Sequence, residues 1–194
     1  MGLINVKIVG VSPLLMHSPS AMTNVDETES AKVTSSARKI TTPEVEAEAV
    51  AYRLKSGNLY LPATAVKGAM VNASSFRKLG GKLALKPFIA GGTIVLPHEI
   101  DLKQKKFEVD RQTVVIKATK GRIVRCRPRL DKWEAEFQIR FNDEMFSSDA
   151  YIDNIKLCLV DAGLRIGLLD FRPQKSGSFG MFKVVKWEVK KGDA

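Results

Sequence analysis

A glycine-rich, basic segment near the C-terminus, residues 167–182, has the residue types best suited to holding an anion. Its glycines would let backbone N–H groups approach a ligand closely, and concave runs of such groups attract anions. Its cations suit phosphate, and its phenylalanines could stack on bases. The residues with these capacities are Gly167, Arg172, Lys175, Gly177, Phe179, Gly180 and Phe182. The segment predicts a cradle for a sugar-phosphate backbone.

A second basic segment is predicted as a β-hairpin over residues 113–129, with Thr119-Lys120-Gly121 as its turn. Arginines alternate along its second strand, at Arg125, Arg127 and Arg129, and a period of two places them on one face. Like charges at this spacing repel each other unless an anion or solvent screens them. The face is therefore either a solvated strand or a contact for phosphate.

Catalytic and metal-binding patterns are sparse in the sequence. The two histidines, His17 and His98, lie far apart and form no HxxxH or HExxH pattern. His17 follows the first predicted strand and could act as a general base. Asp26 lies in a polar stretch beside other acidic residues, where carboxylates are usually solvated. The two cysteines lack metal-site spacing. We expect no metal and no cofactor, and nothing in the sequence requires an enzyme.

The composition favours a polyanionic partner. The 194 residues include 31 Lys plus Arg against 21 Asp plus Glu, which gives a formal net charge of +10. A charge this positive suits nucleic acid, although it says nothing about the fold. Hydrophobic residues make up 44% of the chain, enough for the core of a single domain spanning residues 1–194. No apolar run approaches the length of about 20 residues that spans a bilayer, so we expect a cytoplasmic protein.

The periodicity of apolar residues predicts the helices and strands that position the basic segments. Alternation predicts strands near residues 4–8, 133–141 and 183–189, and the 3.6-residue period predicts helices over 43–54, 63–78 and 148–162. Residues 18–41 lack apolar periodicity and predict a mobile insertion. The order of elements predicts an α+β fold, a ferredoxin-like (RRM-like) βαββαβ core with an antiparallel sheet and large loop and hairpin insertions.

Two motifs resemble the RAMP superfamily of CRISPR-associated RNA-binding proteins. One is the glycine-rich segment, which ends Ser176-Gly177-Ser178-Phe179-Gly180-Met181-Phe182. The other is Leu59-Tyr60-Leu61-Pro62-Ala63-Thr64-Ala65-Val66-Lys67-Gly68-Ala69, which is similar to the entry to a helix in that superfamily. Together they cover about a sixth of the chain. The sequence departs from the family where Asp170-Phe171-Arg172-Pro173 interrupts the glycine-rich segment, and the chain is short for a CRISPR backbone subunit.

The resemblance implies a subunit of a multi-subunit ribonucleoprotein that binds single-stranded RNA and associates with copies of itself along the strand, as in CRISPR effectors of antiviral defence. It implies nucleic-acid contacts at Lys67, Arg172, Lys175, Gly177 and Gly180, and insertions at 18–41 and 113–129. Two alternatives remain open. One is a metal-independent CRISPR-type endoribonuclease with His17 as its general base. The other is a single-stranded DNA-binding or structural phage protein.

Overall fold

The computed structural model describes residues 1–19, 42–79, 81, 83–115 and 121–190, and these form an α+β fold with antiparallel sheets. The predicted insertion at 18–41 lies outside the described residues except for its first two positions, and so does Asp26. None of the helices in the described ranges is both long enough and apolar enough to cross a membrane.

A four-stranded antiparallel sheet forms the centre of the molecule. Its strands are β1 (Gly2–Gly10), β6 (Thr93–Leu96), β10 (Glu134–Phe141) and β11 (Phe182–Lys190), in the order β11-β1-β10-β6. Strand β1 is central, because Val6 lies opposite Phe137 of β10 on one side and Trp187 of β11 on the other. The predicted strands at residues 4–8, 133–141 and 183–189 are therefore confirmed.

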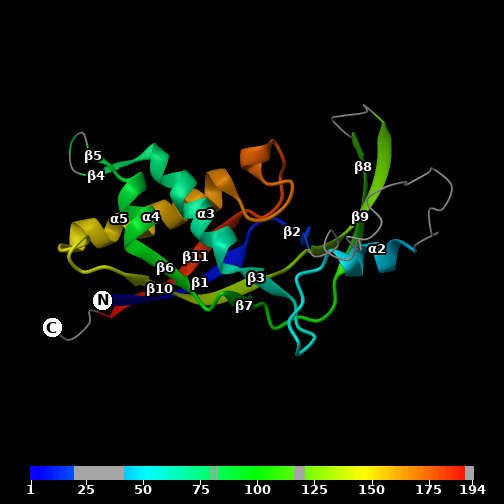
Figure 1. Cartoon of the computed structure of the whole chain (residues 1–194), viewed down its shortest axis with the longest axis horizontal. Coiled ribbons are helices and arrows are strands. Elements are labelled where there is room, and N and C mark those ends of the chain that lie inside the picture. Colours follow the sequence, from blue (N-terminus) through cyan, green and yellow to red (C-terminus); the bar gives the residue numbers. More distant parts are fainter. Residues whose placement is uncertain (20–41, 80, 82, 116–120, 191–194) are drawn as a thin grey trace, which may run out of the picture.

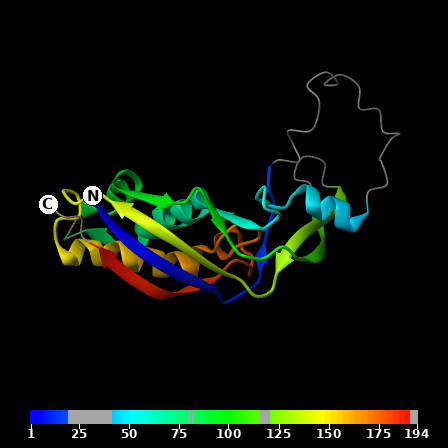
Figure 2. The same cartoon turned by 90° about the horizontal axis from the view of Figure 1, so that it is seen from below.

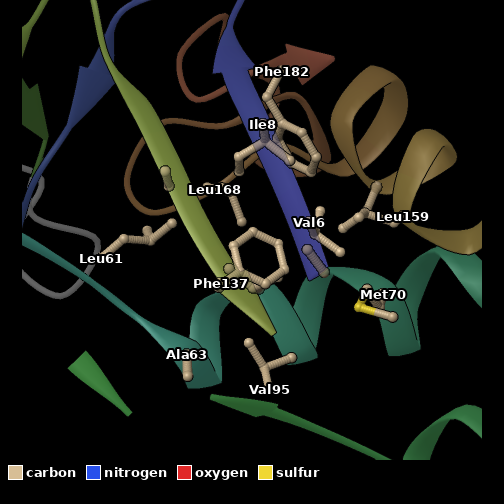
Figure 3. Close-up of a cluster of buried hydrophobic side chains, with 14 of the residues drawn as sticks. Val6, Ile8, Leu61, Ala63, Met70, Val95, Phe137, Leu159, Leu168 and Phe182 are labelled. Carbon is tan, nitrogen blue, oxygen red and sulfur yellow. The ribbon is translucent and has the colours of Figure 1, made fainter. Parts of the chain in front are cut away.

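Two helices, α3 (Ala63–Ala73) and α5 (Asp149–Asp161), lie on the same side of this sheet (Figure 1). The chain passes through β1, α3, β6, β10, α5 and β11 in that order. The side chains between helices and sheet form the main core, in which Val6 and Ile8 of β1 meet Phe137 of β10 and Leu159 of α5 (Figure 3). The alternation that predicted the strands arises from this one-sided burial.

A second unit lies at the opposite end of the molecule from α5 (Figures 1 and 2). It consists of a three-stranded sheet with the order β2-β9-β8, covered by helix α2. Its elements are β2 (Leu14–Leu15), α2 (Pro43–Ala49), β8 (Glu108–Val115) and β9 (Arg122–Leu130). The predicted hairpin is confirmed, although its first strand begins earlier, at Glu108, and residues 116–120 of its turn lie outside the described residues.

Short elements connect these parts. They are the pair β3 (Tyr60–Pro62) and β7 (Glu99–Asp101), the pair β4 (Lys78–Leu79) and β5 (Leu83–Ala84), helix α4 (Lys86–Gly92), a π-turn (Ala162–Ile166) and two 3₁₀ turns (Ser74–Phe76 and Pro173–Lys175). The sequence patterns did not predict α4 or β7.

Three predicted details are wrong. Helix α2 ends at Ala49 rather than Leu54, because Arg53 pairs with Leu59 in a β-bridge. The helix predicted over residues 63–78 is shorter, because α3 ends at Ala73 and Phe76 beyond it is 52% exposed. The helical backbone predicted to end at residue 162 continues beyond α5 through the π-turn to Gly167, whose φ of 75° suits glycine.

Candidate nucleic-acid interface

A groove between helix α3 and the glycine-rich segment brings together residues that are remote in sequence. It encloses a cavity of about 360 Å³. Its lining consists of His17, Tyr52, Thr64, Ala65, Gly68, Ala69, Asn72, Ile166, Gly167, Leu169, Asp170 and Arg172. The predicted general base, the helix-entry motif and the glycine-rich segment therefore meet at one place.

Helix α3 presents a stripe of small residues to the groove. Ala65, Gly68, Ala69 and Asn72 recur at helical spacing on one face, whereas Val66 and Met70 are fully buried against the core on another. Small side chains keep the groove open, and Asn72 supplies a polar group at its edge. The 3.6-residue period predicted this helix and gave no sign of the groove.

The glycine-rich segment folds back on itself instead of offering its N–H groups to solvent. The N–H of Gly177 donates to the Arg172 carbonyl at 3.0 Å, and that of Gly180 donates to the Pro13 carbonyl at 2.7 Å. A Cβ atom at Gly177 would overlap the Phe171 carbonyl, and one at Gly180 would overlap Leu168. The predicted cradle of free N–H groups is therefore wrong for these two glycines, which serve close backbone packing.

The cations of this segment remain available to a ligand. The guanidinium of Arg172 donates to neutral oxygens, the Leu169 carbonyl at 2.8 Å and Gln174 Oε1 at 3.1 Å, so its charge is not cancelled. Lys175 is exposed. Arg172 lines the groove itself, and the contacts with nucleic acid predicted for both residues stay predictions.

Aromatic rings lie beside these cations. Phe171 is 41% exposed, and its ring centroid is 6.0 Å from that of the partly exposed Phe179. Phe171 was missed by the sequence interpretation, which treated its tetrapeptide only as a departure from a family pattern. By contrast, Phe182 is 1% exposed and packs edge-on against Trp133. The predicted stacking role of Phe182 is therefore wrong.

Lys67 does not face the groove. Its Nζ donates to the carbonyls of Ile89 and Thr93 and to Thr93 Oγ1 at 2.6 Å, so it joins α3 to α4 and β6. Burial lowers the pKa of Lys67 to about 8, because the charged form loses solvation. The contact with nucleic acid that the resemblance implied for Lys67 is not supported by this geometry.

The arginines of strand β9 share one face, as predicted, but the chain's own carboxylates lie beside them. The Arg127 side chain is buried and pairs with Asp170 of the glycine-rich segment. Arg129 pairs with Asp131, and Arg125 lies 3.9 Å from Glu46 of α2. Much of the charge on this face is therefore balanced within the protein, and Arg127 ties the hairpin unit to the groove.

His17 and Tyr52 also line the groove. The Tyr52 hydroxyl donates to the His17 carbonyl at 3.4 Å, and its ring packs edge-on against Tyr60. Burial raises the pKa of Tyr52. The His17 imidazole is exposed. His98 is not part of this groove and lines a separate hollow beside Lys67.

The described residues contain no group of His, Cys, Asp and Glu able to hold a metal ion. Both cysteines are buried and free. Burial raises the pKa of the Cys158 thiol to about 12, which suits a core residue rather than a nucleophile. The groove has Arg172 in its lining, and the exposed Lys175 and the Phe171 and Phe179 rings belong to the same glycine-rich segment.

The chain matches no family model and no curated protein sequence.

Proposed function

We propose that this protein is a single-stranded nucleic-acid-binding subunit, with RNA as its expected ligand, and that it grips the strand along the groove between α3 and the glycine-rich segment. The observation that carries the proposal is that the two motifs with a resemblance to the RAMP superfamily, residues 59–69 and 167–182, line one cavity. These motifs are about a hundred residues apart in sequence. Each was identified from its residue types alone, so their proximity in the fold is a separate observation.

The arrangement of the sheet supports a ferredoxin-like assignment. Strand, helix, two strands, helix and strand follow one another, and the sheet order places the last strand beside the first. The outward positions of this sheet carry no aromatic side chain, so recognition would differ from that of RRM domains, which stack bases on the sheet. The helix-and-loop side is the better candidate for contact with the strand.

In the proposed mechanism, Arg172 and Lys175 neutralise phosphates while Phe171 and Phe179 stack on exposed bases. The hairpin unit, which projects from the same region, adds the half-exposed Arg125. Side-by-side association of copies along the strand, in a CRISPR-like ribonucleoprotein, belongs to this proposal through the resemblance.

The test is binding of fluorescent oligonucleotides of about 15 nucleotides, oligo-U and oligo-dT, over a series of salt concentrations. We expect Arg172→Ala with Lys175→Ala to weaken binding at least about tenfold at low salt. If both side chains contact phosphates, the slope of log affinity against log salt falls by about 1.4, because each contact contributes about 0.7 on single strands.

The matched control removes two cations from the outer face of the sheet, Lys183→Ala with Lys186→Ala. This change lowers the net charge equally, so it reports any effect of charge alone. Equal losses of affinity in both double variants would contradict binding of the strand at the groove. Stronger binding to oligo-dT than to oligo-U would instead favour the DNA-binding alternative, and self-association without any nucleic acid would favour a structural protein.

A second candidate, a metal-independent endoribonuclease, is favoured by one observation: His17 lines the same groove. An exposed imidazole beside bound RNA could accept the proton of a 2′-hydroxyl as a general base. RNA cleavage that persists in a chelator and is lost in His17→Ala would support this activity. Intact RNA after prolonged incubation with the wild-type protein would exclude it.

A further inference from the structure

The glycines beside the groove differ in whether a Cβ atom would fit at each position. Gly163, Gly177 and Gly180 have no room for a Cβ atom, because each would overlap a neighbouring backbone carbonyl. Gly68 is different, since a Cβ built there meets no described atom within 4 Å apart from its chain neighbours and the nearby backbone of its own helix. It lies in the middle of the 11-residue helix α3, where glycine costs about 0.5–1 kcal/mol relative to alanine. No contact described within the chain explains why this position is glycine.

The space above Gly68 is the groove cavity. Its volume of about 360 Å³ is near the lower end of the range of ligand sites, roughly 300–1,000 Å³, which suits a single planar ring system. Ala65 and Ala69 flank Gly68 on the same wall, so a flat ligand could approach the helix backbone closely. A phosphate or a sugar alone would not need such an apolar floor.

The polar groups around this floor match the edge of a base. Asn72 lies one helical turn after Gly68, and within the described residues its amide makes no hydrogen bond with another group. The amide offers a donor and an acceptor together, the pair that reads N7 and the N6 amino group of adenine. Asp170 and Arg172 on the facing wall add a further acceptor and a further donor.

We infer that the cavity over Gly68 takes one unstacked base of the bound strand, preferably adenine, and so gives the protein sequence preference at one position. This inference rests on the proposed function. Phosphate contacts at Arg172 and Lys175 carry no sequence information. A cavity that holds one base would let the protein discriminate between bases. Asn72 is the residue that reads the base, and Gly68 is the residue that lets the base approach.

The experiment compares an oligonucleotide of about 15 uridines with the same strand carrying one central adenosine, cytidine or guanosine (the thymidine series replaces it if DNA is the ligand). We expect the wild-type protein to bind the adenosine strand about tenfold more tightly than the uridine strand, which is within the range for one bidentate base contact. Asn72→Ala and Gly68→Leu should abolish this preference, whereas the salt slope should stay near its wild-type value because the phosphate contacts at Arg172 and Lys175 are kept.

Gly91→Leu is the matched control. A Cβ at Gly91, near the end of helix α4, also meets nothing within 4 Å, yet Gly91 is not part of the cavity lining. It should keep the wild-type preference. Thermal unfolding of each variant checks folding, and Asn72→Ala, which adds no bulk, carries the test if Gly68→Leu fails to fold.

Two further results would count against the inference. Salt-dependent binding without any base preference, or a preference that survives Gly68→Leu, would overturn the base site and leave the proposed function standing. No binding of any strand would overturn the proposed function, and the base site with it.

Discussion

The outer face of the four-stranded sheet and the groove between α3 and the glycine-rich segment are both polar, but their charges are arranged differently. On the sheet, Lys7 contacts Glu134 at 2.9 Å and Glu136 at 3.3 Å, and Lys186 contacts Glu188 at 3.1 Å. In the groove, the acceptors of Arg172 among the described residues are the neutral oxygens of Leu169 and Gln174. A cation whose charge is balanced by its own chain has little left for a phosphate, so the positive net charge alone does not locate a binding face.

The largest effect is expected where the backbone of the glycine-rich segment leaves no room for a side chain. Gly177→Ala would place a methyl group on the Phe171 carbonyl, and a backbone atom cannot move aside as the end of a side chain can. We expect a loss of about 3 kcal/mol in unfolding free energy, the upper part of the range for overpacking. Urea unfolding measures it, with Gly68→Ala as the control, which should unfold at equal or higher urea. Equal stabilities of the two variants would show that the glycine-rich segment is not packed as described.

The next effect concerns the ion pair between the hairpin unit and the groove. The Arg127 side chain is 6% exposed, whereas that of Asp170 is 38% exposed. Breaking a fully buried pair costs about 3–5 kcal/mol, so we expect about 2 kcal/mol for Asp170→Asn. A double-mutant cycle with Arg127→Gln should give a coupling energy of at least about 1 kcal/mol. Strict additivity would mean that the pair does not join the two units.

A smaller effect is expected from the exposed ring of the glycine-rich segment. Phe171→Ala should weaken binding of single strands by about 1 kcal/mol, roughly fivefold, the lower end for a stacked base. The affinity should change with little change in salt slope, because no phosphate contact is lost. Val185→Ala is the control, since Val185 is 47% exposed on β11 of the sheet. An equal loss in the control would contradict a specific role for Phe171.

The smallest effect is expected from the ion pairs of the sheet. Hydrogen bonding from Lys7 lowers the pKa of Glu136, so the carboxylate form is favoured in the folded protein. The stabilisation is therefore present above the ordinary pKa of 4.5 and is lost as the pH falls through the lower pKa of the folded state. Lys7→Ala should lower the unfolding free energy only slightly at neutral pH and not at all in acid. Exposed ion pairs contribute little to stability. A large, salt-independent loss of unfolding free energy in this variant would therefore contradict the description of the sheet's outer face.

The sequence predicted the elements that are buried on one side and missed those determined by distant contacts. Trp133, Phe137 and Phe141 alternate with charged residues, and the structure buries all three. Helix α4 and strand β7 are too short to show a recognisable period of apolar residues in the sequence. The constraint on Gly163 is also a distant one, because a Cβ atom there would overlap the Phe182 carbonyl of β11.

The residue types of the candidate site could be read from the sequence, whereas its geometry could not. The types of Arg172 and Lys175 indicated an anion site, and both side chains lie where an anion could reach them. The partners of Lys67 and Arg127 could not be predicted, because Ile89, Thr93 and Asp170 are brought to them only by tertiary folding. For the same reason, no local pattern shows that Tyr52 and Asn72 line the same cavity.

The most direct test of the central claim is photo-crosslinking of a single strand containing 4-thiouridine, followed by mass-spectrometric mapping of the attached peptides. If the strand lies in the groove, the cross-links will fall on peptides containing Tyr52, Phe171 and Phe179, and Arg172→Ala with Lys175→Ala will reduce them together. Cross-links confined to the outward residues of β1 and β10, with none at the groove, would contradict the account.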